Sequence, residues 1–484
     1  METLQRTANR GSISTGPYDI DNSVKFESAN TESLTKSQTA SNRKTWTLSF
    51  WFKRTKVNAD LQYTFQANVS SSTVFDIMLN GTTDWRISDY TSGSRSLAFY
   101  STVPLRDASA WYHLVVACDT TQSTSTDRFK IYLNGVQVDT ISGYFSTAQY
   151  PAEDYETNIN NSAATLSIGK SISASTNFCG YMAEVNFIDG LMKDEEDFGE
   201  FDSDSGIWIP KQYTGSYGNE GYYLDFADAS DLGDDESGNG KDFTENNITA
   251  ADQATDTPTN NFCTLNPLNV NSATASNNPT YTEGNTRTTS TLDDYWQTAI
   301  ATIGVTSGKW YMEGQLIYDP AMAGIGVGDF GDIENWGRNN DNVMVGKAIG
   351  YGTPKAEVGD SLPATANDYT NSNIIGVALD ADNGKVYWSR DNVYQSSMNP
   401  VTGANGISIP TGGDAEGLYM FAVSAYKATH GSYTGNAGWL VNFGGFTNIS
   451  ISSAASDANG YGTFEYAPPS GYYALCTKNL AEYG

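Results

Sequence analysis

The clearest alternating pattern of the chain lies at residues 45–53, which read Thr-Trp-Thr-Leu-Ser-Phe-Trp-Phe-Lys. Successive side chains of a β-strand point to opposite faces, so alternate residues of this segment share a face. One face carries Trp46, Leu48, Phe50 and Phe52. Aromatic residues also fit a pleated sheet better than a helix. The pattern therefore predicts a strand with one packed face and one partly solvated face.

Further strand patterns follow at short, regular intervals. Residues 111–118 are apolar on both faces, which predicts a central strand covered on two sides. Residues 130–138 contain Asn134-Gly135, a dipeptide that suits the positive φ angles of a type I′ turn. With this turn, Leu133 faces Val136 and Ile131 faces Val138, so all four share one face. A second hairpin is predicted across Asp382-Asn383-Gly384.

The chain has 484 residues, more than one hydrophobic core normally serves. We predict an all-β fold of two β-sandwich (jelly-roll-like) domains in tandem. The expected parts are an N-terminal arm (1–22), a first sandwich (23–200), an irregular Gly/Asp/Asn-rich connector that packs on the first sandwich and ends in a linker near 270–290 (201–290), and a second sandwich (291–484).

Charge and composition exclude several classes of partner. The chain has 27 basic and 56 acidic residues, a formal charge of −29, and no cluster of Lys and Arg. Nucleic acid and anionic membranes are therefore not expected as partners. We expect no membrane insertion, because no apolar run is long enough to span a bilayer. The N-terminus lacks the apolar core of a signal peptide, and the four scattered cysteines form no CxxC, so we expect synthesis in a reducing cytoplasm.

Several motifs in order carry a resemblance to known families. Residues 23 to about 190 resemble a laminin-G-like, concanavalin A-like lectin domain through 24–26, 46–52, 111–115, 131–135, 168–169 and 180–185. Residues 308–475 resemble a SPRY domain through 308–313, 325–327, 350–351, 375–380, 383–387, 442–444 and 469–475. The tandem, with a connector segment such as 233–242, also resembles virion proteins of tailed marine phages, particularly tail or head fibres.

These resemblances imply recognition rather than catalysis. The leading hypothesis is a bacteriophage virion protein, a tail or head fibre or appendage, that binds host surface carbohydrate through loops of its two sandwiches. The expected partners are other virion proteins and copies of itself, with trimers suggested by family habit alone. One alternative is a decoration protein that only packs on virion neighbours. A third and less favoured hypothesis is a polysaccharide-degrading spike.

The sequence contains no convincing catalytic set, and we do not expect an enzyme. A glycosidase needs two carboxylates across a cleft. Glu195, Glu196 and Asp197 cluster beside a glycine, which is typical of a solvated surface turn. His113 lies within the predicted strand at 111–118 and is better explained as a residue of the sandwich than as a base.

One acidic, glycine-rich stretch is a candidate calcium site. Its oxygen-bearing residues bracket Gly238 and Gly240, which allow the backbone to bend around an ion. The candidate ligands are Asp231, Asp234, Asp235, Asn239 and Asp242. The spacing is not that of an EF-hand, and an ordinary Asp/Gly-rich turn would give the same composition.

A polar loop with one tryptophan is the candidate carbohydrate site. An aromatic face stacks on a sugar ring while Asn and Asp bond its hydroxyls. The candidate residues are Trp336, Arg338, Asn339, Asn340 and Asp341. A solvated loop with the Trp packed on the sheet is an equally good explanation. A comparable loop, residues 89–95 (Asp-Tyr-Thr-Ser-Gly-Ser-Arg), lies in the first predicted sandwich.

Overall fold

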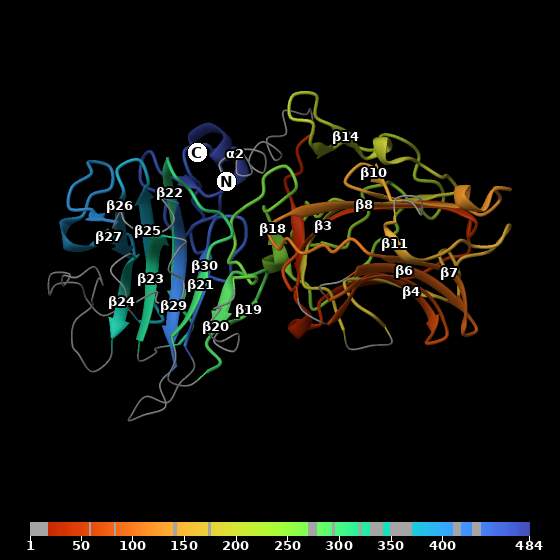
Figure 1. Ribbon diagram of the computed structural model, residues 1–484, viewed down its shortest axis with the longest axis horizontal. Coiled ribbons are helices and arrows are strands. Elements are labelled where there is room, and N and C mark those ends of the chain that lie inside the picture. Colours follow the sequence, from red (N-terminus) through yellow and green to blue (C-terminus); the bar gives the residue numbers. More distant parts are fainter. Residues whose placement is uncertain are drawn as a thin grey trace. The chain divides into compact units, whose positions relative to one another are not determined.

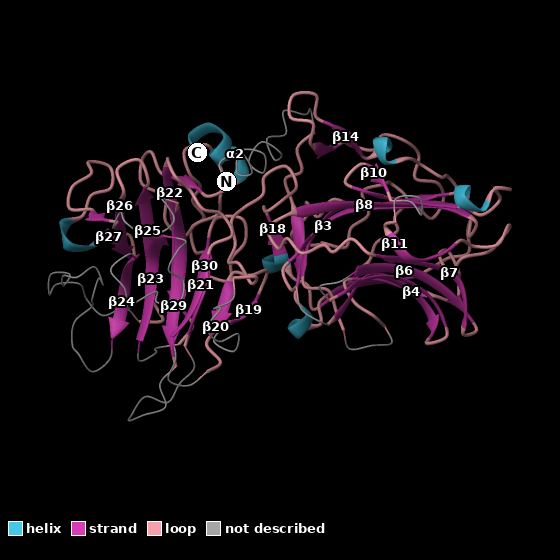
Figure 2. Cartoon of the chain, in the orientation of Figure 1, coloured by secondary structure: helices cyan, strands magenta, loops and turns pink. Residues whose placement is uncertain are grey.

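The computed structural model describes most of the chain. The described residues are 18–57, 60–81, 84–138, 143–172, 176–269, 278–292, 296–318, 322–329, 342–348, 370–409, 418–427 and 437–484. Two compact units divide the chain, Met1–Asn260 and Asn261–Gly484. Both are built from antiparallel sheets, so the predicted all-β sandwich fold is confirmed (Figures 1 and 2).

The first unit contains two large sheets that face each other across one core. Its strands are β1 (Ser23–Phe26), β2 (Ser33–Ser37), β3 (Thr45–Arg54), β4 (Leu61–Ser70), β5 (Thr73–Asn80), β6 (Asp84–Thr91), β7 (Ser94–Ser101), β8 (Trp111–Asp119), β9 (Phe129–Leu133), β10 (Val136–Gln137), β11 (Phe145–Gln149), β12 (Thr165–Ile168), β13 (Gly180–Asp189), β14 (Gly199–Phe201), β15 (Trp208–Pro210), β16 (Tyr222–Leu224), β17 (Thr244–Asn246) and β18 (Gln253–Ala254). Short 3-10 turns are η1 (Ser28–Asn30), η2 (Ser125–Asp127), η3 (Glu195–Asp197) and η4 (Ala250–Asp252).

We call the two large sheets the covered sheet and the curved sheet. The covered sheet has the order β10-β9-β8-β3-β13-β1-β18, with β16 also paired to β13. The curved sheet has the order β11-β7-β6-β5-β4-β12-β2-β17. In Figure 1 the strands β4, β6 and β7 of the curved sheet bend visibly beneath β3 and β8. Large aromatic side chains fill the space between the sheets, for example Trp46, whose ring meets that of Phe75 edge-on at 5.5 Å.

Strand β3 confirms the predicted alternation but corrects one of its consequences. Trp46, Leu48, Phe50 and Phe52 all lie in the core between the sheets. The opposite face was expected to be partly solvated, yet Lys53 is fully buried there. The reason is that later parts of the chain pack on that face and exclude water from it.

Residues 199–260, together with the segment beginning at Tyr18, cover the outer face of the covered sheet. Trp208 of β15 packs with Trp51 and Ile20 in one small apolar cluster. The Nζ atom of Lys53 pairs with the Asp256 carboxylate at 2.7 Å, and both side chains are completely buried. The Asp256 carboxylate also accepts a hydrogen bond from the Trp111 indole at 3.1 Å. This face of the sandwich is therefore closed by the chain itself.

The predicted Asn134-Gly135 hairpin is present between β9 and β10. Leu133 pairs with Val136, and the two turn residues have φ angles of 48° and 74°, as a type I′ turn requires. A Cβ atom at position 135 would lie 2.1 Å from the Trp208 ring, so only glycine fits under this tryptophan. Val136, predicted on the packed face, is instead 52% exposed because the hairpin extends past the edge of the core.

The second unit is a smaller pair of sheets. Its strands are β19 (Thr280–Thr282), β20 (Arg287–Thr289), β21 (Trp296–Ile300), β22 (Lys309–Leu316), β23 (Met322–Asp329), β24 (Asn342–Ala348), β25 (Ile374–Asp380), β26 (Lys385–Arg390), β27 (Val393–Tyr394), β28 (Ile407–Ser408), β29 (Tyr419–Tyr426), β30 (Gly438–Asn442) and β31 (Tyr473–Ala474), with η7 (Gln395–Ser397) and the helix α2 (Thr477–Tyr483). One sheet has the order β19-β20-β30-β22-β25-β26-β27 and the other β21-β29-β23-β24. The predicted hairpin across residues 382–384 joins β25 and β26.

The second unit begins earlier than the sequence suggested. We expected residues 201–290 to form a connector, with the second sandwich starting at 291. The structure places residues from Asn261 onward in the second unit, and β20 pairs with β30 of its larger sheet. Residues 280–289 are thus a hairpin rather than part of a linker. Their Thr-rich, Gly-containing sequence resembles a linker, but backbone pairing with β30 decides the structure.

The buried pair of Lys53 and Asp256 yields a prediction about stability. Replacing Asp256 with Ala removes the carboxylate that neutralises Lys53 in a dry interior, which should lower the free energy of unfolding by about 3–5 kcal/mol. Denaturant unfolding monitored by Trp fluorescence measures this loss. The matched control is Asp60→Ala, which removes one partner of the exposed pair with Lys56 and should cost less than about 1 kcal/mol. Equal effects of the two substitutions would contradict the structural role of the buried pair.

Candidate functional site

The outer face of the curved sheet presents the chemistry most suited to a ligand in the part of the chain that the structure describes. Strands β5, β6, β7 and β11 are paired side by side there. Two rows of outward side chains cross them, Asp76–Ser88–Ala98–Gln149 and Met78–Arg86–Tyr100–Thr147. A third, shorter row adds Val74, Tyr90 and Arg95. Small residues thus lie between two rows that carry tyrosines and arginines.

A bulge aims Arg95 onto this face. The pairing of β6 with β7 shifts between Asp89 and Tyr90, so that Tyr90 lies opposite Arg95. Bulges of this kind re-aim side chains and often occur beside functional sites. The turn that follows needs two residues with positive φ, which Ser92 (52°) and Gly93 (81°) supply. Local backbone geometry therefore determines that Tyr90 and Arg95 share a face.

We call Arg86, Tyr90, Arg95 and Tyr100 the Tyr–Arg platform. The two tyrosine hydroxyls are 3.3 Å apart. The guanidinium groups of Arg86 and Arg95 lie 4.8 Å and 5.6 Å from the centre of the Tyr100 ring. Such cation–π contacts hold the ring in place, and Tyr100 stays partly exposed. Burial alone would raise the pKa of Tyr100, but the hydrogen bond from Tyr90 and the nearby Arg95 together lower it.

Neutral groups orient Arg95. Its Nε donates to the Gln149 side-chain oxygen at 3.1 Å, and one Nη donates to the Tyr100 hydroxyl at 3.4 Å. The Gln149 amide in turn donates to the Arg95 carbonyl at 2.7 Å. Arg86 differs, because its Nε pairs with the Asp84 carboxylate at 2.8 Å. Arg95 has no ion pair within the described part of the chain.

A buried polar group borders the platform on the same face. The Gln66 amide donates to the Asp76 carboxylate at 2.7 Å and to the Ser171 hydroxyl at 3.1 Å. Burial raises the pKa of Asp76 to about 6, against the opposing effect of the Gln66 hydrogen bond. This group adds hydrogen-bonding atoms next to the aromatic surface.

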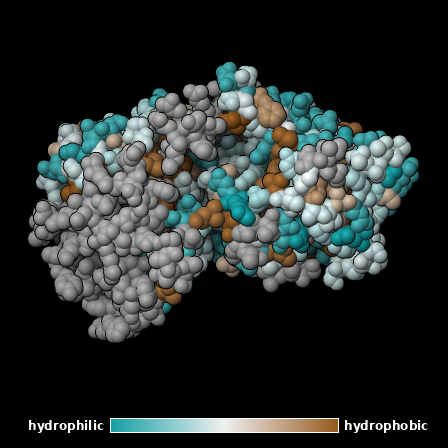
Figure 3. Space-filling model, in the orientation of Figure 1, coloured by the Kyte–Doolittle hydropathy of each residue, from teal (hydrophilic) through white to brown (hydrophobic). Residues whose placement is uncertain are grey.

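The site is an open surface rather than a pocket. A cavity beside Lys36 and Tyr222 and another inside the core near Trp85 each hold only about 10 Å³, room for one water. Small-molecule pockets are far larger, on the order of several hundred Å³. In Figure 3 the visible face of the first unit mixes hydrophilic residues with small separate hydrophobic patches.

No helix in the described residues is long and apolar enough to cross a membrane.

The carbohydrate loop predicted in the second sandwich lies outside the described residues. This applies to Trp336, Arg338, Asn339, Asn340 and Asp341 alike. The comparable loop named at residues 89–95 is described, and it supplies Tyr90 and Arg95 to the platform.

The five predicted calcium ligands lie in one loop, where hydrogen bonds give them another role. The Asp235 carboxylate accepts bonds from the backbone N–H of Tyr223, Ser237 and Lys241 and from the Ser237 hydroxyl, at 2.8–2.9 Å. Asn239 donates its amide to two carbonyls.

The remaining acidic side chains of that loop do not complete a metal site. Asp242 accepts from the Asp235 backbone N–H, and Asp231 from that of Gly233. The pKa of Asp234 is raised, first by burial and then by the negative charges of Asp242 and Asp231. Within the described ranges no group of three or more His, Cys, Asp or Glu side chains is arranged to hold a metal. Bound calcium therefore stays a prediction.

Hydrogen bonds and an ion pair hold the residues that were considered as catalytic candidates in place. Glu195, Glu196 and Asp197 form the turn η3, where Asp197 pairs with Lys193 at 3.3 Å. His113 is buried between its hydrogen bonds to Ser49 and the Trp208 indole, both at 2.9 Å. Burial lowers the pKa of His113 to about 3, so the ring is neutral at physiological pH.

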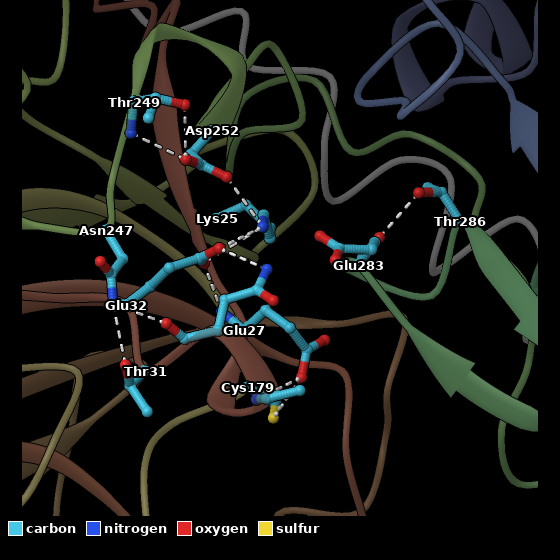
Figure 4. A network of polar contacts seen from close by, with 12 residues as sticks. Lys25, Glu27, Thr31, Glu32, Cys179, Asn247, Thr249, Asp252, Glu283 and Thr286 are labelled. Atoms are coloured by element: carbon cyan, nitrogen blue, oxygen red, sulfur yellow. Dashed lines mark hydrogen bonds and ion pairs between the residues drawn. The ribbon is translucent and has the colours of Figure 1, made fainter.

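Buried charges near β1 connect separate segments of the first unit. Lys25 bonds the Glu32 carboxylate at 2.9 Å and the Asp252 carboxylate at 2.8 Å (Figure 4). Asp252 also closes a capping box with Thr249. Burial raises the pKa of Glu32, although the neighbouring Lys25 opposes this. The network ties the segment ending at η4 to β1, which is a structural role.

A second buried carboxylate, Glu184, lies at a bulge of β13 with a strained φ of 54°. It accepts hydrogen bonds from the Tyr18 and Tyr223 hydroxyls, both at 2.7 Å. Burial raises its pKa to about 7, and the two hydrogen bonds lower it only in part. Glu184 therefore holds Tyr18, and with it the described start of the chain, against the covered sheet.

The raised pKa of Glu184 predicts a pH dependence of stability. Between its unfolded pKa of 4.5 and its folded pKa of about 7, the folded state binds more protons than the unfolded state. Stability should thus fall as pH rises through this range. Relative to Glu184→Gln, the wild type should lose on the order of 2 kcal/mol between pH 5 and pH 8. Denaturant unfolding of both proteins at pH 5 and at pH 8 measures this loss of stability.

The control for this measurement is Glu200→Gln, at an exposed position. This variant should keep the wild-type pH profile. A profile of Glu184→Gln that is parallel to the wild type would show that Glu184 does not titrate in this window.

Sequence reasoning missed half of the platform. Arg86 lies on a strand that the sequence predicts at residues 85–87, but it was not proposed as a site residue, and the strands that carry Tyr100 and Gln149 were not predicted. A signal was present, because tyrosine and arginine occupy positions of β6 and β7 that alternate with buried Ile87 and Phe99. The missing information was the pairing of β6 with β7 and its bulge.

Comparison with known proteins agrees with this architecture. Residues 26–196 match the family model described as the concanavalin A-like lectin/glucanases superfamily. The matched residues are those whose sequence motifs resemble a laminin-G-like, concanavalin A-like lectin domain, so the comparison agrees with that resemblance. The match includes every strand that contributes to the Tyr–Arg platform. No curated protein matches the chain.

Solved structures give weaker similarities. A heptameric SAP-like pentraxin from Limulus polyphemus is 14% identical, with a TM-score of 0.25 over 36% of this chain and 80% of its own. The SPRY domain of human HERC1 is 13% identical, with a TM-score of 0.22 over 32% and 87%. The CBM40 of Ruminococcus gnavus IT-sialidase, bound to α2,3-sialyllactose, is 12% identical, with a TM-score of 0.24 over 37% and 92%.

Proposed function

We propose that the protein is a non-catalytic carbohydrate-binding protein, and that the Tyr–Arg platform on the first sandwich is its binding site. The observation that carries this proposal is the arrangement of Tyr90 and Tyr100 beside two guanidinium groups on the outer face of the curved sheet. Lectin folds host other functions as well, so the site rather than the fold supports the proposal.

The chemistry of a sugar suits this surface. A pyranose ring has an apolar face of C–H groups that packs on an aromatic ring, and a rim of hydroxyls that needs hydrogen-bond partners. Tyr100 offers the ring, and the Arg95 and Gln149 side chains offer polar atoms at its edge. An open surface also admits the interior of a long polysaccharide.

The wider biological role rests on sequence resemblance. We propose a place in the virion of a tailed phage, as a tail or head fibre that recognises host glycans, with other virion proteins and further copies of the chain as neighbours. The support is the tandem of a lectin-like and a SPRY-like domain. A decoration protein without a glycan ligand is the competing candidate, and it is favoured if the platform proves to be buried between neighbouring subunits.

Binding to a glycan array tests the proposed function. The purified full chain should bind a subset of glycans saturably. Tyr100→Ala should weaken that binding by about two- to tenfold, because aromatic contacts of this kind contribute about 0.5–1.5 kcal/mol. The matched control is Tyr318→Ala, at a tyrosine that is 39% exposed in the second unit.

The control variant should bind as the wild type does. Saturable binding that is unchanged by Tyr100→Ala would move the site away from the platform. Absence of glycan binding by the wild-type chain would favour the decoration role.

A further inference from the structure

We propose that the platform selects acidic carbohydrate, with Arg95 as the residue that binds a carboxylate of the sugar. This inference rests on the proposed function, since it names the class of glycan that the same site takes. It follows from the difference between the two arginines of the platform and not from the presence of arginine as such.

The charge of Arg86 is already balanced. Its Nε pairs with the Asp84 carboxylate at 2.8 Å, and two-thirds of its side chain is shielded from solvent. Asp76, the other carboxylate described above for this face, is bonded to Gln66. A ligand would therefore meet these groups as neutral or internally paired partners.

Arg95 differs in both its partners and its exposure. Its two hydrogen bonds go to the neutral oxygens of Gln149 and Tyr100, which use two of the five guanidinium N–H groups. The remaining N–H groups face solvent at an exposed residue. The hydrogen bond to Tyr100 raises the pKa of Arg95 against the opposing effect of burial, and the two platform tyrosines add to the rise. A fixed positive charge with unused donors is thus presented beside the Tyr100 ring.

The geometry suits a carboxylate held next to a ring. A planar guanidinium matches a carboxylate with two parallel N–H···O bonds, and this pairing is stronger than a neutral hydrogen bond. Gln149 restrains Arg95 at both its side chain and its backbone carbonyl, so little order has to be gained on binding. A uronic acid or a related acidic sugar could stack on Tyr100 and place its carboxylate at Arg95.

The overall charge of the chain makes this local group more selective. At a formal −29 the protein repels polyanions in general. A ligand with a net negative charge therefore gains binding free energy only where a positive group is fixed within contact distance. Binding of acidic glycan should for that reason depend on one residue rather than on a diffuse basic surface.

A matched pair of polymers tests the proposal. The probes are polygalacturonate and its carboxyl-reduced form, which share linkage and length but differ in charge. The wild-type chain should bind the acidic polymer at least about tenfold more tightly. Arg95→Gln should remove that preference, because its loss of affinity for the acidic polymer should exceed any loss for the reduced polymer. Arg106→Gln, at an exposed arginine outside the platform, serves as the control and should keep the preference.

Two further measurements distinguish a positioning role of Gln149 from a general attraction between the protein and any anion. Gln149→Ala leaves the Arg95 charge in place but frees its side chain, so affinity for the acidic polymer should fall several-fold more than affinity for the reduced polymer. A comparison of the binding of dextran sulfate with that of dextran shows whether any anionic polymer is bound in the same way.

The outcomes distinguish the inference from the proposed function. Equal binding of the two polygalacturonate forms, abolished by Tyr100→Ala, would overturn the acidic preference and keep the carbohydrate site. An acidic preference that survives Arg95→Gln would overturn the role of Arg95. If neither polymer binds but a neutral glycan does on the array, the acidic preference is also overturned. Absence of all glycan binding would end both proposals.

Discussion

The double burial of strand β3 is the constraint on which the first unit depends. One face of β3 packs into the core, and the other carries a lysine into a dry interface where Asp256 neutralises it. A buried charge without a partner costs several kcal/mol, so residues 199–260 have to return to this face for the sheet to be stable. The outer face of the covered sheet is thereby closed, and the outer face of the curved sheet carries the exposed polar and aromatic side chains.

The curved sheet shows how a small backbone irregularity can produce a site. Regular pairing would place Ser96 opposite Tyr90, whereas the bulge places Arg95 there. Arg95 then reaches the Tyr100 ring and the Gln149 amide, which lie on two neighbouring strands. The hairpin of β6 and β7 is thus combined with the edge strand β11 without a cavity. The resulting surface suits an extended polymer better than a small enclosed ligand.

Much of the fold could be predicted because its signals are local. The alternation at residues 45–53, the apolar strand at 111–118 and the Asn134-Gly135 turn each specify their own structure. Whether the second face of a strand is exposed could not be predicted. Lys53 and Thr47 of β3 are buried by segments of the chain that lie more than a hundred residues further on. Residues 280–289 look like a linker and become a hairpin for the same reason.

The candidate site was less predictable than the fold. The stretch 89–95 drew attention because it combines Tyr and Arg in a turn, yet Tyr100, Arg86 and Gln149 depend on strand pairing that the sequence does not reveal. The acidic loop illustrates the opposite difficulty. Its composition is that of a cation site, but Asp235 directs its oxygens to backbone N–H groups, and composition alone does not distinguish these two uses of a carboxylate.

Hydroxyl-radical footprinting of the tyrosines, with and without a saturating glycan that the chain binds, tests the location of the site most directly. Protection should appear at Tyr90 and Tyr100 on the curved sheet, while Tyr318 should react equally in both states. Protection confined to residues 291–484, with unchanged reactivity of Tyr90 and Tyr100, would contradict a binding surface on the first sandwich.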